Sequence, residues 1–257
     1  MLKIENTEVT GWEAAIRGMR NPMNSWEKGD SGHCLTHGPD HCSECVYASN
    51  GCAASEADLN TRYIIGPNDL DLMTRLRNSG TDHRKFMRMI TAYLDITAPL
   101  YWWKEFDTYK VGTVANSCST MHKIAEKEFT LEDFSHEHLF KEDDVGNRYY
   151  SVTAEEDFTS VDLLKVIIEA LNAYRKTYMA VKADTESNYD HTPKEYWWQM
   201  IQLLPSSYNQ RRTVMLNYEV LANIYKSRRN HKLDEWHTFC DWVEDLPYSE
   251  LITGEKK

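Results

Sequence analysis

The sequence predicts a helix-rich α/β (α+β) fold for the 257-residue chain. Apolar residues recur at three- and four-residue spacing in many segments, and the longest such pattern covers residues 159–182. Residues 92–97 and 213–216 have the alternation and composition of strands. No internal repeat or low-complexity linker divides the chain, so we expect a single domain over residues 1–257.

Residues 98–119 combine a helix start, an aromatic helix and a polar loop. Pro99 suits a first helical turn, where its missing N–H costs little. Four side chains then share one side at i, i+1, i+4 and i+8 spacing, namely Tyr101, Trp102, Glu105 and Tyr109. The helical pattern ends after Lys110, and residues 116–120 supply short polar groups on a loop, a common location for ligands. The alternative is a buried aromatic helix followed by an ordinary polar loop.

Further helices are expected on both sides of this segment. Proline, capping and periodicity signals place them at 11–19, 67–79 with Asn68 as N-cap, 193–204, 219–229 and around Trp236–Val243. Residues 83–91 form a short helical or irregular piece that carries His83, Arg84, Lys85 and Arg88. This basic cluster is suited to a phosphate or a carboxylate, or it is a solvated helix face.

The composition excludes several classes of protein. A net charge of −11 disfavours non-specific binding to nucleic acid or to an anionic membrane surface. The sequence has neither the apolar h-region of a signal peptide nor a run of 18 apolar residues that would span a membrane. We therefore expect a cytoplasmic protein whose six cysteines are thiols or metal ligands rather than disulfides.

A Cys- and His-rich insertion at about residues 30–56 is the candidate metal site. Its Cys-x-x-Cys spacing lets two thiolates reach one ion, and tetrahedral zinc takes four such ligands. The candidate ligands are Cys34, Cys42, Cys45 and Cys52. Four ligands leave no open position, so bound zinc would be structural rather than catalytic. An iron–sulfur cluster and a solvent-exposed insertion with free thiols are the alternatives.

Three blocks, near residues 12–22, 67–122 and 200–246, together resemble the flavin-dependent thymidylate synthases (ThyX family). His83, the strand into Ala98-Pro99 and the stretch 100–122 resemble the family's His loop and its Arg-His-Arg…Ser…Asn-Glu…Ser…Arg-Tyr signature. The later block matches at Leu204-Pro205, Asn217, Leu221, Asn223, Arg228 and Trp236. The resemblance implies one ThyX-like domain with a central sheet flanked by helices.

The chain departs from the family pattern at several charged positions. Arg-His-Arg is replaced by Thr108-Tyr109-Lys110, and the acidic partner of Asn116 becomes Ser117. Two later family arginines fall at Ile201 and Glu219. In the family these arginines hold phosphates by charge-assisted contacts, which are worth roughly 1.5–3 kcal/mol each. The fold is therefore expected to be kept more faithfully than the substrate.

The resemblance implies a reaction in which reduced FAD and methylenetetrahydrofolate convert dUMP, with NADPH reducing the flavin. It assigns catalytic roles to Ser119, Glu105 and Lys110, and substrate contacts to Asn116, Ser117 and Arg228. It assigns flavin contacts to His83, Lys85, Asn217 and Asn223. Family sites lie between the subunits of a homotetramer, so a homo-oligomer is also expected.

Three other interpretations remain open. A diverged homologue that binds a nucleotide or another ligand without this reaction is favoured by the missing arginines. A metal-stabilised interaction protein would use residues 30–56 as a docking surface. A Cys–His nucleophilic enzyme based on Cys118 and His122 is the weakest alternative, because no carboxylate that would orient the histidine is evident.

Overall fold

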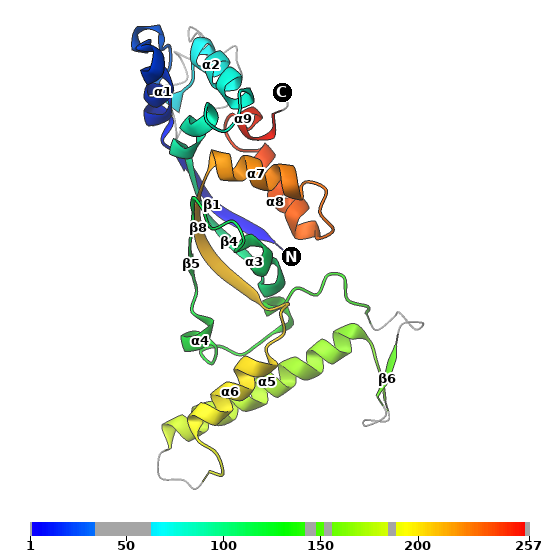
Figure 1. Cartoon of the computed structure of the whole chain (residues 1–257). Helices are drawn as coiled ribbons and strands as arrows, with labels where there is room; N and C mark the ends of the chain where they lie inside the picture. The colour runs from blue at the N-terminus through cyan, green and yellow to red at the C-terminus, as the bar shows by residue number, and fades with distance from the viewer. Residues whose placement is uncertain (1, 34–62, 142–147, 152–155, 185–188, 255–257) are drawn as a thin grey trace, which may run out of the picture. The chain divides into compact units, whose positions relative to one another are not determined.

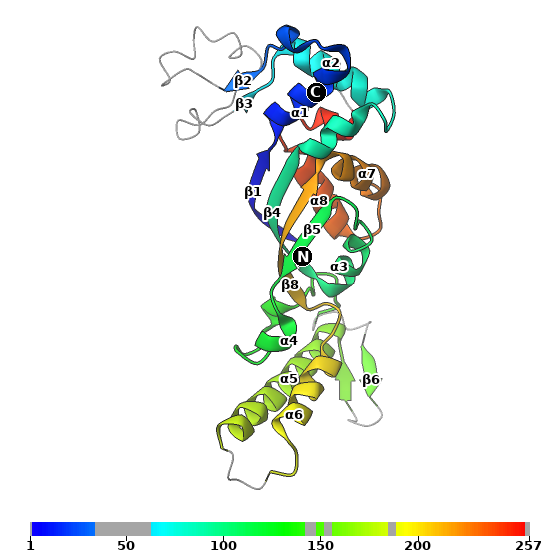
Figure 2. The same cartoon turned by 60° about the vertical axis from the view of Figure 1, so that its left-hand side comes forward.

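The computed structural model describes residues 2–33, 63–141, 148–151, 156–184 and 189–254. A four-stranded sheet has the strand order β1-β4-β8-β5, and its strands are labelled in Figures 1 and 2. These strands are β1 (Lys3–Thr10), β4 (Thr91–Pro99), β5 (Thr113–Ser117) and β8 (Asn209–Asn217). The helix-rich α/β class that the sequence predicts is confirmed.

The chain forms two compact units, and each strand of the sheet contributes residues to both. Unit 1 comprises Met1–Glu5, Asp95–Thr108 and Ala115–Thr213. Unit 2 comprises Asn6–Leu94, Tyr109–Val114 and Val214–Lys257. The expectation of a single domain stays a prediction.

Unit 1 contains a helical hairpin next to an irregular segment. Its helices are α3 (Leu100–Phe106), α4 (Thr120–Lys123), α5 (Ser160–Ala183) and α6 (Pro193–Leu203). α5 packs along α6, as Figure 2 shows. Capping boxes begin both helices, with Thr159 and Asp162 on α5 and Thr192 and Glu195 on α6. Their shared core includes Phe134, Leu164, Ile168, Leu171 and Met200.

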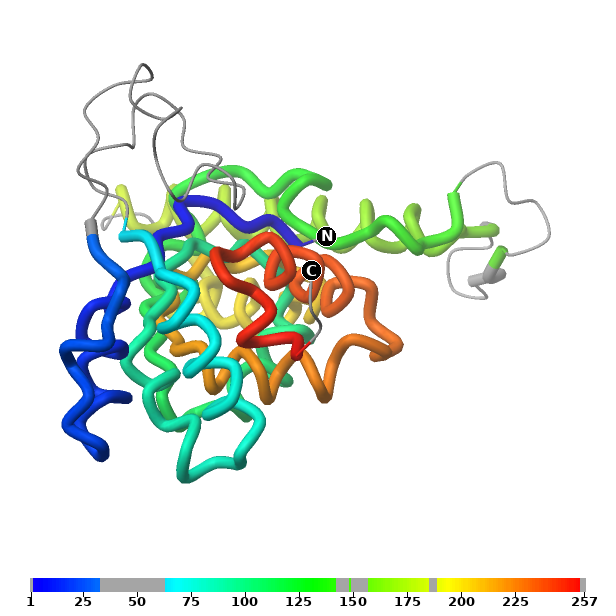
Figure 3. The backbone as a smooth tube through the Cα atoms, turned by 90° about the horizontal axis from the view of Figure 1, so that it is seen from above, coloured from blue at the N-terminus to red at the C-terminus, as the bar shows by residue number. Residues whose placement is uncertain are grey.

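Unit 2 is mainly helical. Its helices are α1 (Trp12–Arg20), α2 (Pro67–Asn78), η5 (Arg84–Met89), α7 (Tyr218–Arg228), α8 (Asp234–Glu244) and α9 (Glu250–Thr253). α1, α2 and α7 all pack against η5, while α8 and α9 pack against α7; Figure 3 traces these segments from blue to red. Fully buried Met73, Tyr218, Trp236 and Phe239 contribute to the core.

The remaining regular elements are short. Two strand pairs are β2 (Gly32–His33) with β3 (Tyr63–Ile64), and β6 (Tyr149–Ser151) with β7 (Glu156–Phe158). Further 3-10 turns are η1 (Asn21–Met23), η2 (Trp26–Lys28) and η6 (Leu131–Asp133). No helix within the described residues combines the length and hydropathy required to cross a bilayer.

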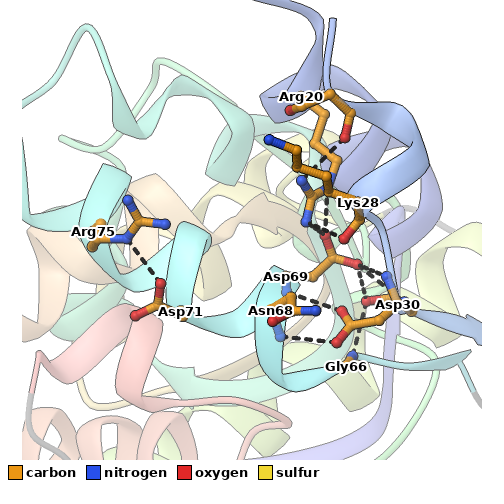
Figure 4. A network of polar contacts seen from close by, with 10 residues as sticks. Arg20, Lys28, Asp30, Gly66, Asn68, Asp69, Asp71 and Arg75 are labelled. Atoms are coloured by element: carbon orange, nitrogen blue, oxygen red, sulfur yellow. Dashed lines mark hydrogen bonds and ion pairs between the residues drawn. The ribbon is translucent and has the colours of Figure 1, made fainter. Parts of the chain in front are cut away.

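A buried ion pair joins α1 to α2 within unit 2 (Figure 4). Arg20 donates from Nε to Asp69 Oδ1 at 2.6 Å, and only 5% of the Arg20 side chain and none of the Asp69 side chain is exposed. The remaining guanidinium donors bind the backbone oxygens of Ser25 and Lys28. Asp69 Oδ2 accepts from the backbone and hydroxyl of Ser31. Every charge in this pair is therefore hydrogen-bonded, as a buried ion pair requires.

Asp30 fixes the start of α2 in the same network. Its two carboxylate oxygens accept from the backbone N–H groups of Asn68 and Asp69, at 2.9 and 3.0 Å. A Cβ at Gly66 would lie 2.2 Å from Asp30 Cγ, so only glycine allows this approach. Asn68, the predicted N-cap, is therefore inside the helix, and Gly66 occupies the cap position.

The aromatic helix is shorter than predicted. α3 ends at Phe106 rather than at Lys110. It buries Trp102, Trp103 and Phe106. The i, i+1 and i+4 spacing of these three side chains places them on one hydrophobic face, so they pack inward.

Two strands also differ from the sequence-based expectation. β8 begins at Asn209 rather than at residue 213, and β1 was not predicted. Both strands carry polar residues at positions that the structure leaves partly exposed, so hydrophobic alternation underestimates them. Residues 113–117, part of which we expected in a loop, form β5.

We predict that Asp69→Asn destabilises the folded protein by about 3–5 kcal/mol, because it leaves Arg20 buried without a counter-charge. Chemical denaturation followed by circular dichroism measures the free energy of unfolding. Asp71→Asn is the matched control, because Asp71 lies on the same helix and pairs with Arg75 in an exposed contact that is worth about 0–1 kcal/mol. Equal losses in the two variants would contradict a special role for the buried pair.

We also predict that protonation of Asp69 lowers the free energy of unfolding in acid. Burial raises the pKa of Asp69, but hydrogen bonds from Ser31 and Arg20 outweigh it and hold the pKa below its ordinary value. The stabilisation is thus complete above the unfolded-state pKa of about 3.9 and is lost as pH falls from there through the lower folded-state pKa. Denaturation curves at several pH values should show a flatter acid limb for Asp69→Asn than for the wild type.

Candidate functional site

In unit 1 the turn after β5 is fastened to the first residues of β8. The backbone N–H of Cys118 donates to the carbonyl of Arg211 at 2.9 Å. Gln210 Nε2 donates to the Cys118 carbonyl at 3.1 Å and to Thr120 Oγ1 at 3.0 Å. These bonds fix Ser119, which lies between Cys118 and Thr120.

Ser119 has a hydroxyl that remains able to donate to a ligand. Its Oγ accepts a hydrogen bond from the backbone N–H of His122 at 3.2 Å, which makes Ser119 the N-cap of α4. The cap uses a lone pair and not the hydroxyl proton. Because the side chain is exposed, that proton can reach a bound molecule.

A cavity of about 440 Å³ lies next to Ser119. Its polar lining combines hydroxyl, amide and cationic groups: Ser119, Thr120, Asn209, Gln210, Arg211, Lys123 and Lys127. Lys123 is paired with Glu126, which also lines the cavity, and Lys127 is paired with Asp133. Exposed pairs of this kind are weak and exchange readily with other anions.

Arg211 is one of the residues that line this cavity. It donates to Asp95 Oδ2 at 2.8 Å and lies 3.5 Å from Glu5 Oε2, yet 46% of its side chain is exposed. The hydrogen bond and charge of Asp95 raise the pKa of Arg211. Thr213, two residues further along β8, also donates to Asp95, at 2.6 Å. Asp95 therefore orients Arg211 while leaving part of the guanidinium accessible.

The opposite side of β8 carries Arg212. Its guanidinium lies over the ring of Trp103 at 4.1 Å and donates to Asp107 at 2.7 Å. Its Nε donates to Gln210 Oε1 at 2.9 Å. Arg212 thus helps to orient the side chain of Gln210, whose Nε2 fixes the turn beside Ser119.

Asn209 adds an unused acceptor to the cavity wall. Among the described residues its buried Oδ1 has no hydrogen-bond partner. An unsatisfied buried acceptor costs about 1–3 kcal/mol. The terminal torsion of an asparagine amide has a broad energy minimum, so the Asn209 amide can rotate at little cost. After such a rotation, a ligand N–H that donated to Oδ1 would remove the cost of the unsatisfied acceptor.

In unit 2 the predicted basic cluster binds a carboxylate of α7. Arg84 Nε donates to Glu219 Oε1 at 3.2 Å, and Arg88 pairs with both oxygens of the same carboxylate. Arg84 also donates to Asn223 Oδ1 at 3.2 Å. Two members of this cluster, Arg84 and Arg88, therefore pair with a carboxylate of the chain itself.

The pKa of Glu219 reflects this pairing. Burial raises it, but the hydrogen bonds and charges of Arg88 and Arg84 lower it further, so the pKa lies below its ordinary value. Glu219 is therefore ionised at neutral pH. One negative charge is shared by two guanidinium groups, which already have a partner before any ligand binds.

Arg228, a predicted substrate contact, lies between aromatic rings of unit 2. Its Nε donates to Tyr109 Oη at 2.9 Å, and its guanidinium lies 4.9 Å from the ring centre of Trp236. Tyr109 stands at the histidine position of the family signature, and the adjacent Lys110 is exposed. These aromatic contacts hold Arg228 in place by cation–π attraction.

Asn217, a predicted flavin contact, has a structural role. Its Oδ1 accepts from the backbone N–H of Val220 at 3.0 Å and caps α7. Gly112, at φ +77°, packs against it so closely that a Cβ would lie 2.6 Å from Asn217 Nδ2. The cap alone accounts for asparagine at this position.

The predicted site residues divide between the two units. Unit 1 holds Glu105, Asn116, Ser117 and Ser119, of which Ser119 lines the described cavity. Unit 2 holds His83, Lys85, Lys110, Asn217, Asn223 and Arg228. Within unit 2, Asn223 is joined to Arg84 through a hydrogen bond, and the side chains of His83 and Lys85 are exposed. The roles assigned to these residues stay predictions.

The four cysteines proposed as zinc ligands, Cys34, Cys42, Cys45 and Cys52, lie outside the described residues. Over the part of the chain that is described, no cluster of three His, Cys, Asp or Glu side chains could hold a metal ion. The metal site and the interaction surface at residues 30–56 therefore stay predictions.

The sequence-based site lacked Asn209, Gln210, Arg211 and Arg212. The available signal was the run of four long polar side chains just after Pro205 and just before an apolar strand. Alternation within that run places Gln210 and Arg212 on one side and Arg211 on the other. Hydrophobic alternation detects only the apolar part of β8, at residues 213–216, and therefore does not reveal this polar run.

Comparisons with known proteins agree on the fold. No protein-family model matches the sequence, and no curated protein sequence matches it. A crystal structure of thymidylate synthase X (ThyX) from Helicobacter pylori with FAD and dUMP superimposes with a TM-score of 0.56 at 14% identity, covering 99% of this chain and 98% of that one. The UMP/dUMP methylase PolB from Streptomyces cacaoi, bound to 5-Br UMP, gives a TM-score of 0.50 at 13% identity over 99% and 94% of the two chains.

These likenesses extend over nearly the whole of each chain and not over a local motif. At 13–14% identity they establish how the chain folds and leave its chemistry to the residues described above. The chain therefore has a ThyX-like fold, as the sequence resemblance predicts.

Proposed function

We propose that unit 1 binds a pyrimidine nucleoside monophosphate of the UMP/dUMP class in the cavity beside Ser119. The observation that carries this proposal is that one cavity is lined by Ser119, Asn209 and Arg211, which are a hydroxyl-bearing, a carboxamide-bearing and a partly exposed cationic residue. The ThyX and PolB structures with the same fold were determined with dUMP or its bromo-UMP analogue, which supports this ligand class.

Each group has a role that suits its chemistry. Arg211 and Lys123 would neutralise the phosphate, since both carry positive charge at neutral pH and line the cavity. The Ser119 hydroxyl would donate to a phosphate or carbonyl oxygen. The Asn209 amide oxygen would accept from the uracil N3–H, which supplies the hydrogen bond that this oxygen lacks in the protein alone.

The same fold suggests a second function, flavin-dependent methyl transfer to the bound nucleotide. FAD would supply the redox chemistry, with a folate as methylene donor and NADPH as reductant, in a homo-oligomer. At Arg84 and Arg88, close to the predicted flavin contact Asn223, the described residues do not fit the flavin diphosphate. Arg84 and Arg88 are already held by Glu219, so a diphosphate there would meet a buried carboxylate.

This disagreement favours nucleotide binding without tight flavin binding. The family pattern has an arginine where this chain has Glu219, so a positive charge is replaced by a negative one. The favourable contacts of Arg84 and Arg88 are made within the protein instead of with a ligand. We therefore give nucleotide binding as the principal function and methyl transfer as the activity to be tested after it.

We predict that Arg211→Gln weakens dUMP binding at least tenfold, because a charge-assisted contact is worth about 1.5–3 kcal/mol. Ser119→Ala should weaken it about two- to tenfold, because a neutral hydrogen bond is worth about 0.5–1.5 kcal/mol. Isothermal titration calorimetry of the full chain with dUMP and UMP measures both effects. Lys176→Gln on α5 is the control, because Lys176 is an exposed cation of the same unit that does not line the cavity.

The cavity assignment would be wrong if the wild type bound neither nucleotide, or if Lys176→Gln weakened binding as much as Arg211→Gln. Circular dichroism of each variant shows whether unit 1 remains folded, since Arg211 also contacts Asp95.

We predict that the purified protein, incubated with excess FAD and then passed through a gel-filtration column, elutes with much less than one FAD per chain. The reason is the engagement of Arg84 and Arg88 by Glu219. The visible absorbance spectrum of the eluted protein measures the bound flavin. Flavin bands at one equivalent per chain would overturn this prediction and make methyl transfer the principal function.

A further inference from the structure

A second cavity, of about 270 Å³, lies within unit 2 among α2, η5, α7 and α9. Four of its lining side chains are cationic: Arg77, Arg84, Lys226 and Arg229. They come from three separate parts of unit 2, since Arg77 is on α2, Arg84 is on η5, Lys226 is on α7 and Arg229 directly follows α7 as its C-cap. No lining residue of this cavity among those described is acidic.

The carboxylates near these cations balance only part of their charge. Glu219 pairs with Arg84 but is shared with Arg88. Arg229 donates to Asp241 at 2.5 Å and lies 3.3 Å from Glu244. Lys226 is exposed and has no acidic partner among the described residues.

Arg77 is the most constrained cation of the four. Its guanidinium donates to the backbone carbonyls of Leu251 and Ile252, at 3.2 and 3.1 Å. Gly254, at φ +83°, passes so close that a Cβ would lie 2.4 Å from Arg77 Nη2. Burial and the nearby charge of Arg84 both lower the pKa of Arg77. The fold therefore holds two guanidinium groups within electrostatic reach of each other beside a cavity.

Helix dipoles explain part of this arrangement but not its convergence. Arg77, Lys226 and Arg229 lie at or just beyond the last turns of α2 and α7, where cations are favourable. That effect acts on each helix separately and requires no shared cavity. The dipole effect does not account for Arg84, which is on η5. It also does not explain why four cationic side chains surround one cavity in a chain of net charge −11.

We propose that this cavity binds a phosphate group, either as free phosphate or as a phosphate monoester. A dianionic phosphate between Arg77 and Lys226 would relieve the repulsion among the cations and form charge-assisted hydrogen bonds with them. The site is additional to the nucleotide cavity, because all of its residues belong to unit 2 and none lines the cavity beside Ser119.

The test is calorimetric titration of the full chain with inorganic phosphate and, separately, with AMP, at constant ionic strength set with chloride. Lys226→Gln should weaken phosphate binding about tenfold, because it removes a charge-assisted contact. Lys232→Gln is the control, since Lys232 is exposed, belongs to the same unit and does not line the cavity. Arg77→Gln should weaken binding as well, with folding checked by circular dichroism because Arg77 also holds α9.

Arg211→Gln separates the two proposed sites. Phosphate binding that survives in Arg211→Gln and is weakened in Lys226→Gln supports the cavity of unit 2, whether or not dUMP binds beside Ser119. Phosphate binding that is weakened only in Arg211→Gln overturns this inference and leaves the nucleotide proposal intact. Absence of phosphate binding in the wild type also overturns it. If inorganic phosphate and AMP bind equally, the site recognises the phosphate group alone, whereas tighter AMP binding identifies a monoester ligand.

Discussion

The candidate chemistry of both units depends on the register of β8 (Asn209–Asn217). Its first residues fix the turn that carries Ser119, and its last residue, Asn217, caps α7. Because successive strand residues point to opposite faces, a shift of one residue would exchange Arg211 and Arg212. Arg211 would then leave Asp95, and Arg212 would leave the ring of Trp103. The register is held by buried Val214 and Leu216, which continue the side of Gln210 and Arg212.

Glu219 shows how one charge decides whether a basic cluster is balanced within the chain. An arginine at this position, next to Arg84 and Arg88, would repel them unless an anionic ligand were bound. A glutamate instead pairs with both arginines, so no ligand is required to offset their mutual repulsion. The structure thus combines a ThyX-like fold with an internal ion pair at this position.

The sequence predicted those elements whose signals are local. The apolar periodicity of α5 and the capping and proline signals of α6 predict boundaries within one or two residues of the observed ones. The polar strand β1 and the first half of β8 could not be found in this way, because their place in the sheet is set by partners far away in the sequence. For the same reason Ser119 was identified from a motif, whereas Asn209 and Arg211 became evident only when β8 was placed beside it.

Charge pairing distinguishes the structural cations from those available to ligands. Arg20 is fully satisfied by Asp69 and backbone carbonyls, and it is buried, so it has no capacity to bind anything else. Arg211 is oriented by carboxylates but remains nearly half exposed, so part of its guanidinium is accessible to solvent. Lys226 lines a cavity without an acidic partner among the described residues. In a chain with an excess of acids, a cation that is left accessible in a cavity requires a reason, and an anionic ligand supplies one.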